Sequence, residues 1–144
     1  SLPPELGMRL KALSEVVPSP LEMPDVLADA AIKRGLVGDR RLYVCAGRLV
    51  ASKRVDKVID YVASSRERDD RVLVVLGDGP ERPRLERVAR GWQMDIRFLG
   101  KTSRREALGW IGAADELVHA SRAEGLSTVI REAERLGVPV TILS

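Results

Sequence analysis

Five short, mostly apolar runs constrain the fold of this chain most, and the first four are each followed by a helical pattern. The runs cover residues 42–46, 72–76, 96–99, 116–119 and 138–143. A near-continuous apolar run is typical of a strand that is covered on both faces. Strands that alternate with helices through short connections form a parallel sheet with right-handed crossovers. The sequence therefore predicts an α/β, Rossmann-like, mainly parallel sheet with helices on both faces.

Helical patterns precede the first predicted strand and lie between the later ones. Apolar residues at positions 26, 27, 30 and 31 predict an amphipathic helix from Asp25 to Gly35 or Gly38. The next helix covers 53–66, where apolar residues recur at 55, 58, 59, 62 and 63. Two more begin near Pro80, which suits a first helical turn, and after Ser103, a good N-cap residue.

Length and composition indicate one globular domain, residues 1–144, large enough for a hydrophobic core. The net charge of +3 is too small to indicate nucleic acid, and 3% aromatic residues leave few rings to stack on single-stranded bases.

The only cysteine, Cys45, lies in an apolar run, which indicates a buried side chain and excludes an intrachain disulfide. The single histidine, His119, excludes a histidine-rich metal site. We expect a cytoplasmic setting, because no run of about 18 apolar residues or signal-peptide core occurs.

Residues 1–24 differ in character from the rest of the chain. A short helix is predicted from Glu5 to Leu13, but prolines at 18, 20 and 24 prevent a regular helix beyond it. We therefore interpret this segment as mainly an extended connector.

Candidate ligand-binding residues follow four of the predicted strands. In a parallel α/β sheet, ligands bind beyond the carboxyl ends of the strands. Because all four loops would meet at that edge, together they predict one site. Its members, in strand order, are Gly47, Arg48 and Lys53, then Gly77, Asp78 and Gly79, then Gly100 and Lys101, and finally residues 121–127.

The stretch 120–134 has the features of a strand-to-helix turn that binds phosphate. Gly125 permits close backbone approach, and Ser127 and Thr128 are good N-cap residues. The free N–H groups and dipole of a helix start suit an anion. Glu124 and Glu132 bracket the turn with seven residues between them. One turn into the helix, Glu132 could accept hydrogen bonds from two neighbouring hydroxyls, such as those of a ribose.

The other loops admit two interpretations each. Arg48 and Lys53 lie at a strand end and a predicted helix start, where positive charge is unfavourable unless an anion is near. They are either a diphosphate clamp, which we favour, or solvated surface charges. The glycines of 77–80 either cradle a ligand or only turn the chain, and neither a dinucleotide fingerprint nor a P-loop is present. His119 is a core or rim residue rather than a catalyst.

Four ordered segments carry a family resemblance: GRLVASKRVDKVID (47–60), LVVLGDGPERPRLE (73–86), IRFLG (96–100) and ASRAEGLSTVIREAERLGVPV (120–140). They resemble the carboxy-terminal lobe of the retaining, nucleotide-sugar-dependent glycosyltransferases of GT-B fold, group 1 (family 4-like). The resemblance covers about residues 42–144, and the connector resembles the interlobe region. It implies a fragment of a two-lobe protein whose missing amino-terminal lobe would bind the acceptor and make any membrane contact.

The resemblance also implies a role for each site residue. Arg48 and Lys53 would bind the donor diphosphate and stabilise the leaving nucleoside diphosphate, and Glu124 would face the sugar; these are the predicted catalytic residues. Leu99 and Lys101 would flank the base, the turn amides of 125–128 would hold phosphate and sugar, and Glu132 would bind the ribose. No metal or other cofactor is implied. The predicted donor-binding set is Gly47, Gly77, Gly79, Leu99, Lys101, Ser121, Gly125, Leu126, Ser127, Thr128 and Glu132.

Three positions depart from the family pattern. Arg54 stands where a glycine often follows the lysine, Ala120-Ser121 replaces Pro-Ser, and Ser127 replaces a glycine. The last change could narrow the space at the phosphate and alter the choice of donor.

The sequence thus predicts a donor-binding domain that serves transfer of a hexosyl-type sugar, with retention and without a metal, from a donor of UDP or GDP type. The chain alone is predicted to be inactive. A non-catalytic module that binds a nucleotide or a phosphorylated sugar is the main alternative. An epimerase of the same fold family ranks lower, because of the spacing of Glu124 and Glu132.

Overall fold

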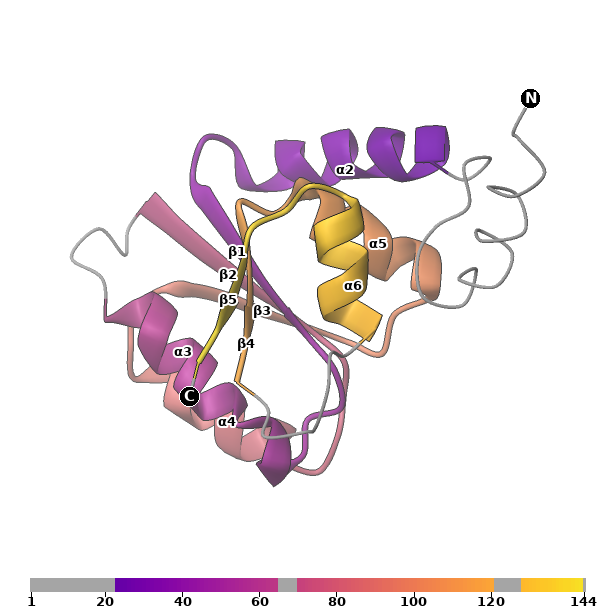
Figure 1. Ribbon diagram of the computed structural model, residues 1–144. Helices are drawn as coiled ribbons and strands as arrows, with labels where there is room; N and C mark the ends of the chain where they lie inside the picture. Colours follow the sequence, from indigo (N-terminus) through magenta and orange to yellow (C-terminus); the bar gives the residue numbers. More distant parts are fainter. Residues whose placement is uncertain (1–22, 65–69, 121–127, 144) are drawn as a thin grey trace.

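The chain folds around one five-stranded sheet in which every pair of neighbouring strands is parallel (Figure 1). The computed structural model describes residues 23–64, 70–120 and 128–143. The strand order is β3-β2-β1-β4-β5, which confirms the predicted Rossmann-like architecture. The strands are β1 (Arg41–Ala46), β2 (Arg71–Leu76), β3 (Asp95–Gly100), β4 (Glu116–His119) and β5 (Val140–Ile142).

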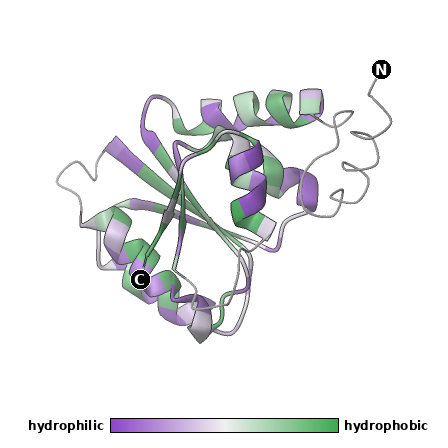
Figure 2. Cartoon of the chain, viewed as in Figure 1, coloured by the Kyte–Doolittle hydropathy of each residue, from purple (hydrophilic) through white to green (hydrophobic). Residues whose placement is uncertain are grey.

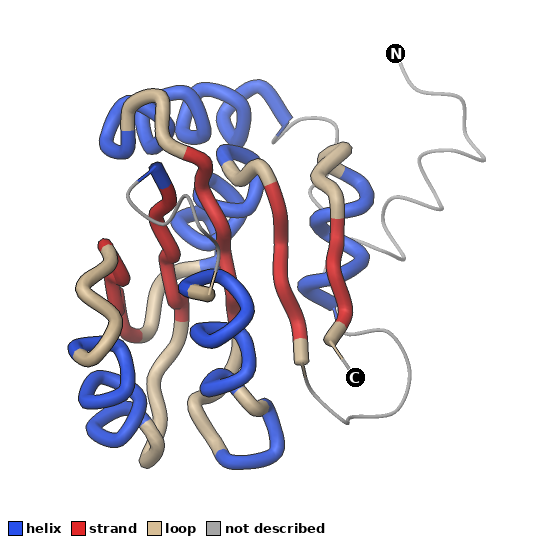
Figure 3. The backbone as a smooth tube through the Cα atoms, turned by 90° about the vertical axis from the view of Figure 1, so that its left-hand side faces the viewer, coloured by secondary structure: helices blue, strands red, loops and turns tan. Residues whose placement is uncertain are grey.

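Helices cover both faces of the sheet (Figures 1 and 3). One layer holds α3 and α4, the opposite layer holds α5 and α6, and α2 packs on α5. The helices are α2 (Met23–Val37), α3 (Val55–Ala63), α4 (Arg82–Arg90), α5 (Arg104–Ala113) and α6 (Thr128–Arg135), with a 3-10 turn, η1 (Ala51–Lys53), before α3. None of the described helices has the length and apolar character needed to cross a bilayer.

Alternating residues of the central strands divide the core into two clusters. In β1, Leu42 and Val44 pack beneath α5 and α6, whereas Tyr43 and Cys45 pack beneath α3 and α4. This follows from the period of two along a strand. Both faces of β1 and β2 are apolar (Figure 2), as the continuous runs predicted.

Two predicted helix starts are wrong by a few residues, and both corrections bear on the site. The residues of the 53–66 stripe are all buried, but α3 begins only at Val55 because Arg54 takes a left-handed conformation (φ 47°, ψ 47°). Lys53 therefore ends the 3-10 turn instead of lying in the first turn of α3. Helix α4 begins at Arg82, so Pro83 and not Pro80 occupies its first turn. The last strand is also shorter than predicted.

The buried face of α2 differs from the predicted one. Val26, Ala30, Lys33 and Val37 are buried, whereas Leu27 is 57% exposed. The covering element is α5, where Gly109 lets the helices approach: an added Cβ there would lie 3.0 Å from the Asp29 Cβ. The predicted helix at 5–13 and residues 1–22 of the predicted connector (1–24) lie outside the described residues, and its last two residues, Met23 and Pro24, instead begin α2.

Candidate functional site

Main-chain hydrogen bonds join the loops that follow β1, β2 and β3. The Gly47 N–H donates to the Leu76 carbonyl oxygen (N···O 3.0 Å), and the Gly77 N–H donates to the Gly100 carbonyl oxygen (2.8 Å). The Leu49 N–H donates to the Asp78 carbonyl oxygen (3.0 Å). We call this unit the loop floor; it consists of residues 47–49 and 77–79, Gly100 at the end of β3, and Lys101 after it. It lies at the carboxyl edge of the sheet, where the sequence predicted the site.

Two glycines make the loop floor possible. Gly77 has φ +122°, and a Cβ added to it would overlap the carbonyl oxygen of Gly47. A Cβ added to Gly79 would lie 2.5 Å from the Leu49 carbonyl oxygen. These glycines therefore do more than turn the chain, because only residues without a side chain allow this approach.

A cavity of about 480 Å³ lies on the loop floor. All of its lining residues belong to the predicted loops; they are Gly47, Arg48, Gly77, Asp78, Gly79 and Lys101. Arg48 and Lys101 bring exposed positive charge to it. The carboxylate of Asp78 accepts from the Gly79 N–H (2.8 Å) and pairs with Arg82 (Oδ2···Nη1 3.0 Å), and these contacts lower its pKa. The cavity thus presents net positive charge, which suits an anionic ligand.

Arg82 is a supporting residue that the sequence analysis did not single out. Its guanidinium reaches the Asp78 carboxylate, the Glu86 carboxylate (Nε···Oε1 3.1 Å) and the Phe98 carbonyl oxygen (Nη2···O 3.3 Å). It thereby ties the loop after β2 to β3. The spacing of four between 78, 82 and 86 was a visible signal for the ion pairs, but the contact with Phe98 depends on tertiary structure.

Lys53 flanks the loop floor at the ends of β1 and β4. Burial lowers the pKa of His119 on β4, and the charge of Lys53 lowers it further. A Cβ added to Gly47 would lie 4.0 Å from the Lys53 Cε. Arg48 and Lys53 therefore both lie beside Gly47, although Lys53 does not line the cavity. Burial raises the pKa of the Cys45 thiol to about 12, so this cysteine is a packing residue and not a nucleophile.

Glu132 lies in α6 and is only 7% exposed. Its Oε1 accepts from the Arg104 Nη1 at the start of α5 (2.9 Å). Burial raises the pKa of Glu132, and Arg104 opposes that rise. Ser103 caps α5 as predicted, by accepting from the Glu106 N–H, whereas Arg104 was not among the predicted site residues. A cation at a helix start, the signal that pointed to Lys53, was present here too.

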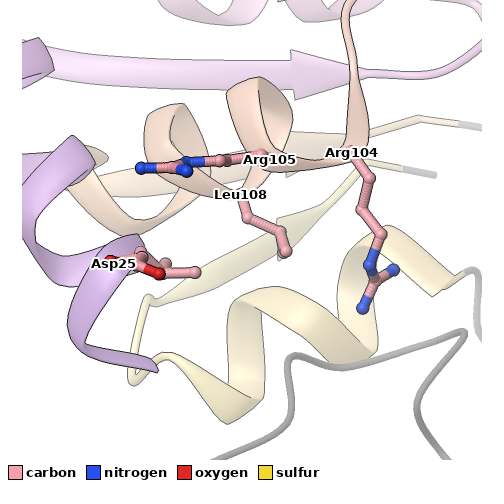
Figure 4. Close-up of a pocket in the computed structure, with 5 residues that line it drawn as sticks. Asp25, Arg104, Arg105 and Leu108 are labelled. Atoms are coloured by element: carbon pink, nitrogen blue, oxygen red, sulfur yellow. The ribbon is translucent and has the colours of Figure 1, made fainter. Parts of the chain in front are cut away.

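Arg104 also borders a second cavity, of about 320 Å³, between α2 and α5 (Figure 4). In this view the side chains of Arg104 and Arg105 diverge, with Arg104 directed toward α6. Arg105 pairs with Asp29 of α2 (Nε···Oδ2 2.8 Å). Both arginines of this cavity are thus already paired with acidic residues, in contrast to Arg48 and Lys101 on the loop floor, which form no ion pair among the described residues.

The remaining predicted residues are placed as follows. Leu99 is 39% exposed near the end of β3, and Thr128 is the first, exposed residue of α6. Within residues 23–64, 70–120 and 128–143 no group of three or more His, Cys, Asp or Glu side chains could hold a metal. The residues that lie outside the described part of the chain are Ser121, Glu124, Gly125, Leu126 and Ser127.

The fold and the cationic loop floor define a class: a Rossmann-like α/β lobe with a positively charged cavity at the carboxyl ends of its strands. Within that class, the chain belongs to the family glycosyl transferases group 1, whose model matches residues 29–143. The resemblance found in the sequence is therefore confirmed, including the assignment to one lobe of a GT-B fold.

Named relatives are similar over most of this chain. The GDP-mannose-dependent alpha-(1-6)-phosphatidylinositol monomannoside mannosyltransferase of Mycobacterium tuberculosis is 34% identical over 128 residues, which are 81% of this chain and 33% of that protein. The alpha-D-kanosaminyltransferase of Streptomyces kanamyceticus is 33% identical over 71% of this chain and 27% of its own. The crystal structure of WaaG, a glycosyltransferase involved in lipopolysaccharide biosynthesis, matches with a TM-score of 0.70 and 27% identity over 83% of this chain and 32% of that one. The chain thus spans between about a quarter and a third of the length of these relatives.

Proposed function

We propose that this chain is the donor-binding lobe of a glycosyltransferase that moves a hexosyl-type sugar from a nucleoside diphosphate sugar to an acceptor with retention. The cavity on the loop floor carries the proposal, because its glycine edges and its two exposed cations suit a diphosphate. Membership of the family supports it. The name of the mycobacterial relative supports a nucleoside diphosphate sugar as donor, and GDP is therefore the first nucleotide to test.

Each part of the site would contribute a separate interaction. Arg48 and Lys53 would hold the diphosphate and stabilise its charge as it leaves, together with the helix start at Thr128. This positive charge would make a metal ion unnecessary. Lys101 and Leu99 would flank the base, Glu132 would accept from the ribose hydroxyls, and Glu124, outside the described residues, would face the sugar.

The relatives extend well beyond the part that this chain matches, which is 33% of the mycobacterial protein. We propose that a second lobe binds the acceptor and closes over the donor. Closure holds the reacting atoms together and excludes water, and both effects contribute strongly to the rate. The chain alone is therefore expected to bind the donor but to form no glycoside.

Calorimetric titration with GDP, UDP and the corresponding nucleosides tests the site. Arg48→Ala and Lys53→Ala should each weaken binding of the nucleoside diphosphate by about tenfold, the value of one charge-assisted hydrogen bond. The loss should shrink at high salt, because part of the attraction is screened. Arg87→Ala, at an exposed cation near the end of α4, serves as the control and should leave binding unchanged.

Two results would contradict the proposal. If nucleoside and nucleoside diphosphate lose affinity equally in the Arg48 and Lys53 variants, these residues do not hold the diphosphate. If this chain bound a nucleoside diphosphate tightly but a longer protein containing it transferred no sugar from any nucleotide sugar, the non-catalytic binding module would be the better interpretation.

A further inference from the structure

We propose that Arg104 is a positioning residue that fixes the carboxylate of Glu132 as the acceptor for the ribose hydroxyls of the bound nucleotide. The inference rests on the proposed function and adds a residue to its site. Glu132, the acidic residue expected to bind the ribose, is already held at one carboxylate oxygen by Arg104 from a different helix.

The two residues reach each other because α5 and α6 pack side by side and both begin near the carboxyl edge of the sheet. Arg104 is the first residue of α5, and Glu132 lies one turn into α6. The Arg104 side chain is 38% exposed, whereas that of Glu132 is 9% exposed. The contact with the arginine therefore limits the orientations that the buried carboxylate can adopt.

A carboxylate buried to this degree requires a partner. An unpaired buried charge is unfavourable, so without one the group takes up a proton or turns toward water. Burial raises the pKa of Glu132, and the charge and hydrogen bond of Arg104 oppose this. Arg104 therefore favours the charged form of Glu132 and holds it in place, and a charged carboxylate is the stronger acceptor for a hydroxyl.

The pair leaves room for the ribose. A carboxylate offers about four acceptor positions on its two oxygens. Among the described residues, Arg104 donates to Oε1 of Glu132, so acceptor positions remain for two neighbouring hydroxyls. Arginine and ribose can thus share one carboxylate, and ribose binding does not require the ion pair to break.

The neighbouring arginine provides a matched control. Arg105 follows Arg104 in the same helical turn, but its guanidinium pairs with Asp29 of α2, at 2.8 Å, and not with Glu132. Figure 4 shows the two side chains diverging. A change at Arg105 removes the same charge from the same turn without touching Glu132.

The experiment measures the preference for ribose over 2′-deoxyribose. Dissociation constants are determined for GDP and 2′-deoxy-GDP, and for UDP and 2′-deoxy-UDP, with the unchanged chain and with Arg104→Gln, Arg104→Lys, Arg105→Gln and Glu132→Gln. The unchanged chain should prefer the ribonucleotide by about tenfold, a typical value for one hydrogen bond to a charged group. Arg104→Gln should abolish most of that preference, Arg104→Lys should retain part of it, and Arg105→Gln should keep it.

The ratio of the two dissociation constants separates a positioning role from general instability, because a loosened fold weakens the binding of ribonucleotide and deoxyribonucleotide alike. Combining Arg104→Gln with Glu132→Gln should lower the preference no further than either change alone. The inference would be overturned if Arg104→Gln preferred the ribonucleotide as strongly as the unchanged chain does, or more strongly. A stronger preference would show that Arg104 withholds Glu132 from the nucleotide.

Other outcomes of the same titrations would contradict the proposed function instead of the role of Arg104. If the unchanged chain binds neither diphosphate, the donor site itself is wrong. If it binds GDP and 2′-deoxy-GDP equally, Glu132 does not hold the ribose. The inference alone fails if the unchanged chain prefers the ribonucleotide, Glu132→Gln loses this preference and Arg104→Gln keeps it.

Discussion

Arg54 has a backbone conformation that its side chain disfavours. It takes φ 47° and ψ 47° between η1 and α3, at the position where the family resemblance expects a glycine. A residue with a Cβ in the left-handed region costs about 1 to 2 kcal/mol relative to the right-handed one. Its side chain pairs with Asp56 (Nε···Oδ1 3.2 Å), but a partly exposed pair of this kind contributes little.

We therefore expect Arg54→Gly to stabilise the chain. Relief of the backbone strain outweighs the extra entropy of glycine in the unfolded state, which leaves a gain of about 0.5 to 1 kcal/mol in the free energy of unfolding. Urea denaturation at neutral pH measures it. Arg54→Ala removes the ion pair but keeps the Cβ and should give no gain, so equal stability of the two variants would argue against strain.

Individual site residues were predictable where the sequence itself restricts the backbone, and not where packing decides. Gly77 and Gly79 stood out because they follow an apolar run at the carboxyl edge of the predicted sheet, and the structure shows backbone contacts that exclude a Cβ. Arg104 did not stand out, because its partner Glu132 lies 28 positions away. That contact exists only once α5 and α6 pack together.

Among the described helices, α2 and α5 share the most extensive contact. Besides Gly109, Gly112 lies against the Ala30 side chain, where an added Cβ would come within 3.3 Å of the Ala30 Cβ. Small residues on α5 thus set the distance between the two helices. Helix α2 reaches the rest of the molecule mainly through this contact.

Opposite effects are expected from two glycine substitutions in this helix pair. Gly109→Leu should lower the free energy of unfolding by about 1 to 3 kcal/mol, because the larger side chain forces α2 away from α5. Gly35→Ala, on the open side of α2 with no atom within 4 Å of the added Cβ, should raise it by about 0.5 to 1 kcal/mol through helix propensity. Thermal and urea unfolding distinguish the two. A neutral Gly109→Leu would mean that the contact is loosely packed in solution.

The elements themselves were largely predictable because hydrophobic periodicity reflects burial directly. The stripe of Val55, Val58 and Ile59 is buried as expected. The exposed face of α2 was not predictable, because this helix carries apolar residues all round and the pattern alone does not tell which side α5 will cover. Exact ends were missed where one residue, such as Arg54, interrupts an otherwise continuous pattern.

Over the whole molecule, ion pairs of aspartates determine the acid stability. The hydrogen bond from Arg97 holds the pKa of Asp95 below its usual value, and Arg40 adds to this against the effect of burial. Burial acts to raise the pKa of Asp115, but the Leu42 amide and Arg34 lower it overall. A carboxyl whose pKa is lower in the folded state contributes stability above its unfolded pKa, and the contribution is lost as the pH falls through the folded value.

The contribution of these aspartates should therefore persist from neutral pH down to about pH 5 and be lost progressively below about pH 4, near the pKa of an unfolded aspartate, whereas the lowered pKa of His119 should already reduce stability below about pH 6.5. Asp95→Asn should lower stability at neutral pH and flatten the decline in acid. Asp60→Asn, at an exposed position of α3, should leave the curve unchanged. Urea denaturation across this pH range gives the comparison, and a decline equally steep in Asp95→Asn would exclude Asp95 as a contributor.

The loop floor has a consequence for how such a lobe can evolve. Its three loops are fastened by main-chain groups, so exchange of the side chains that line the cavity, such as Arg48, Asp78 or Lys101, does not remove the bonds between them. Mutations there can alter the charge and shape presented to a ligand while the frame is inherited intact. Gly77 and Gly79 have no such freedom. Descendants of one ancestral lobe could therefore exchange one donor for another through single substitutions, without passing through an unfolded intermediate form.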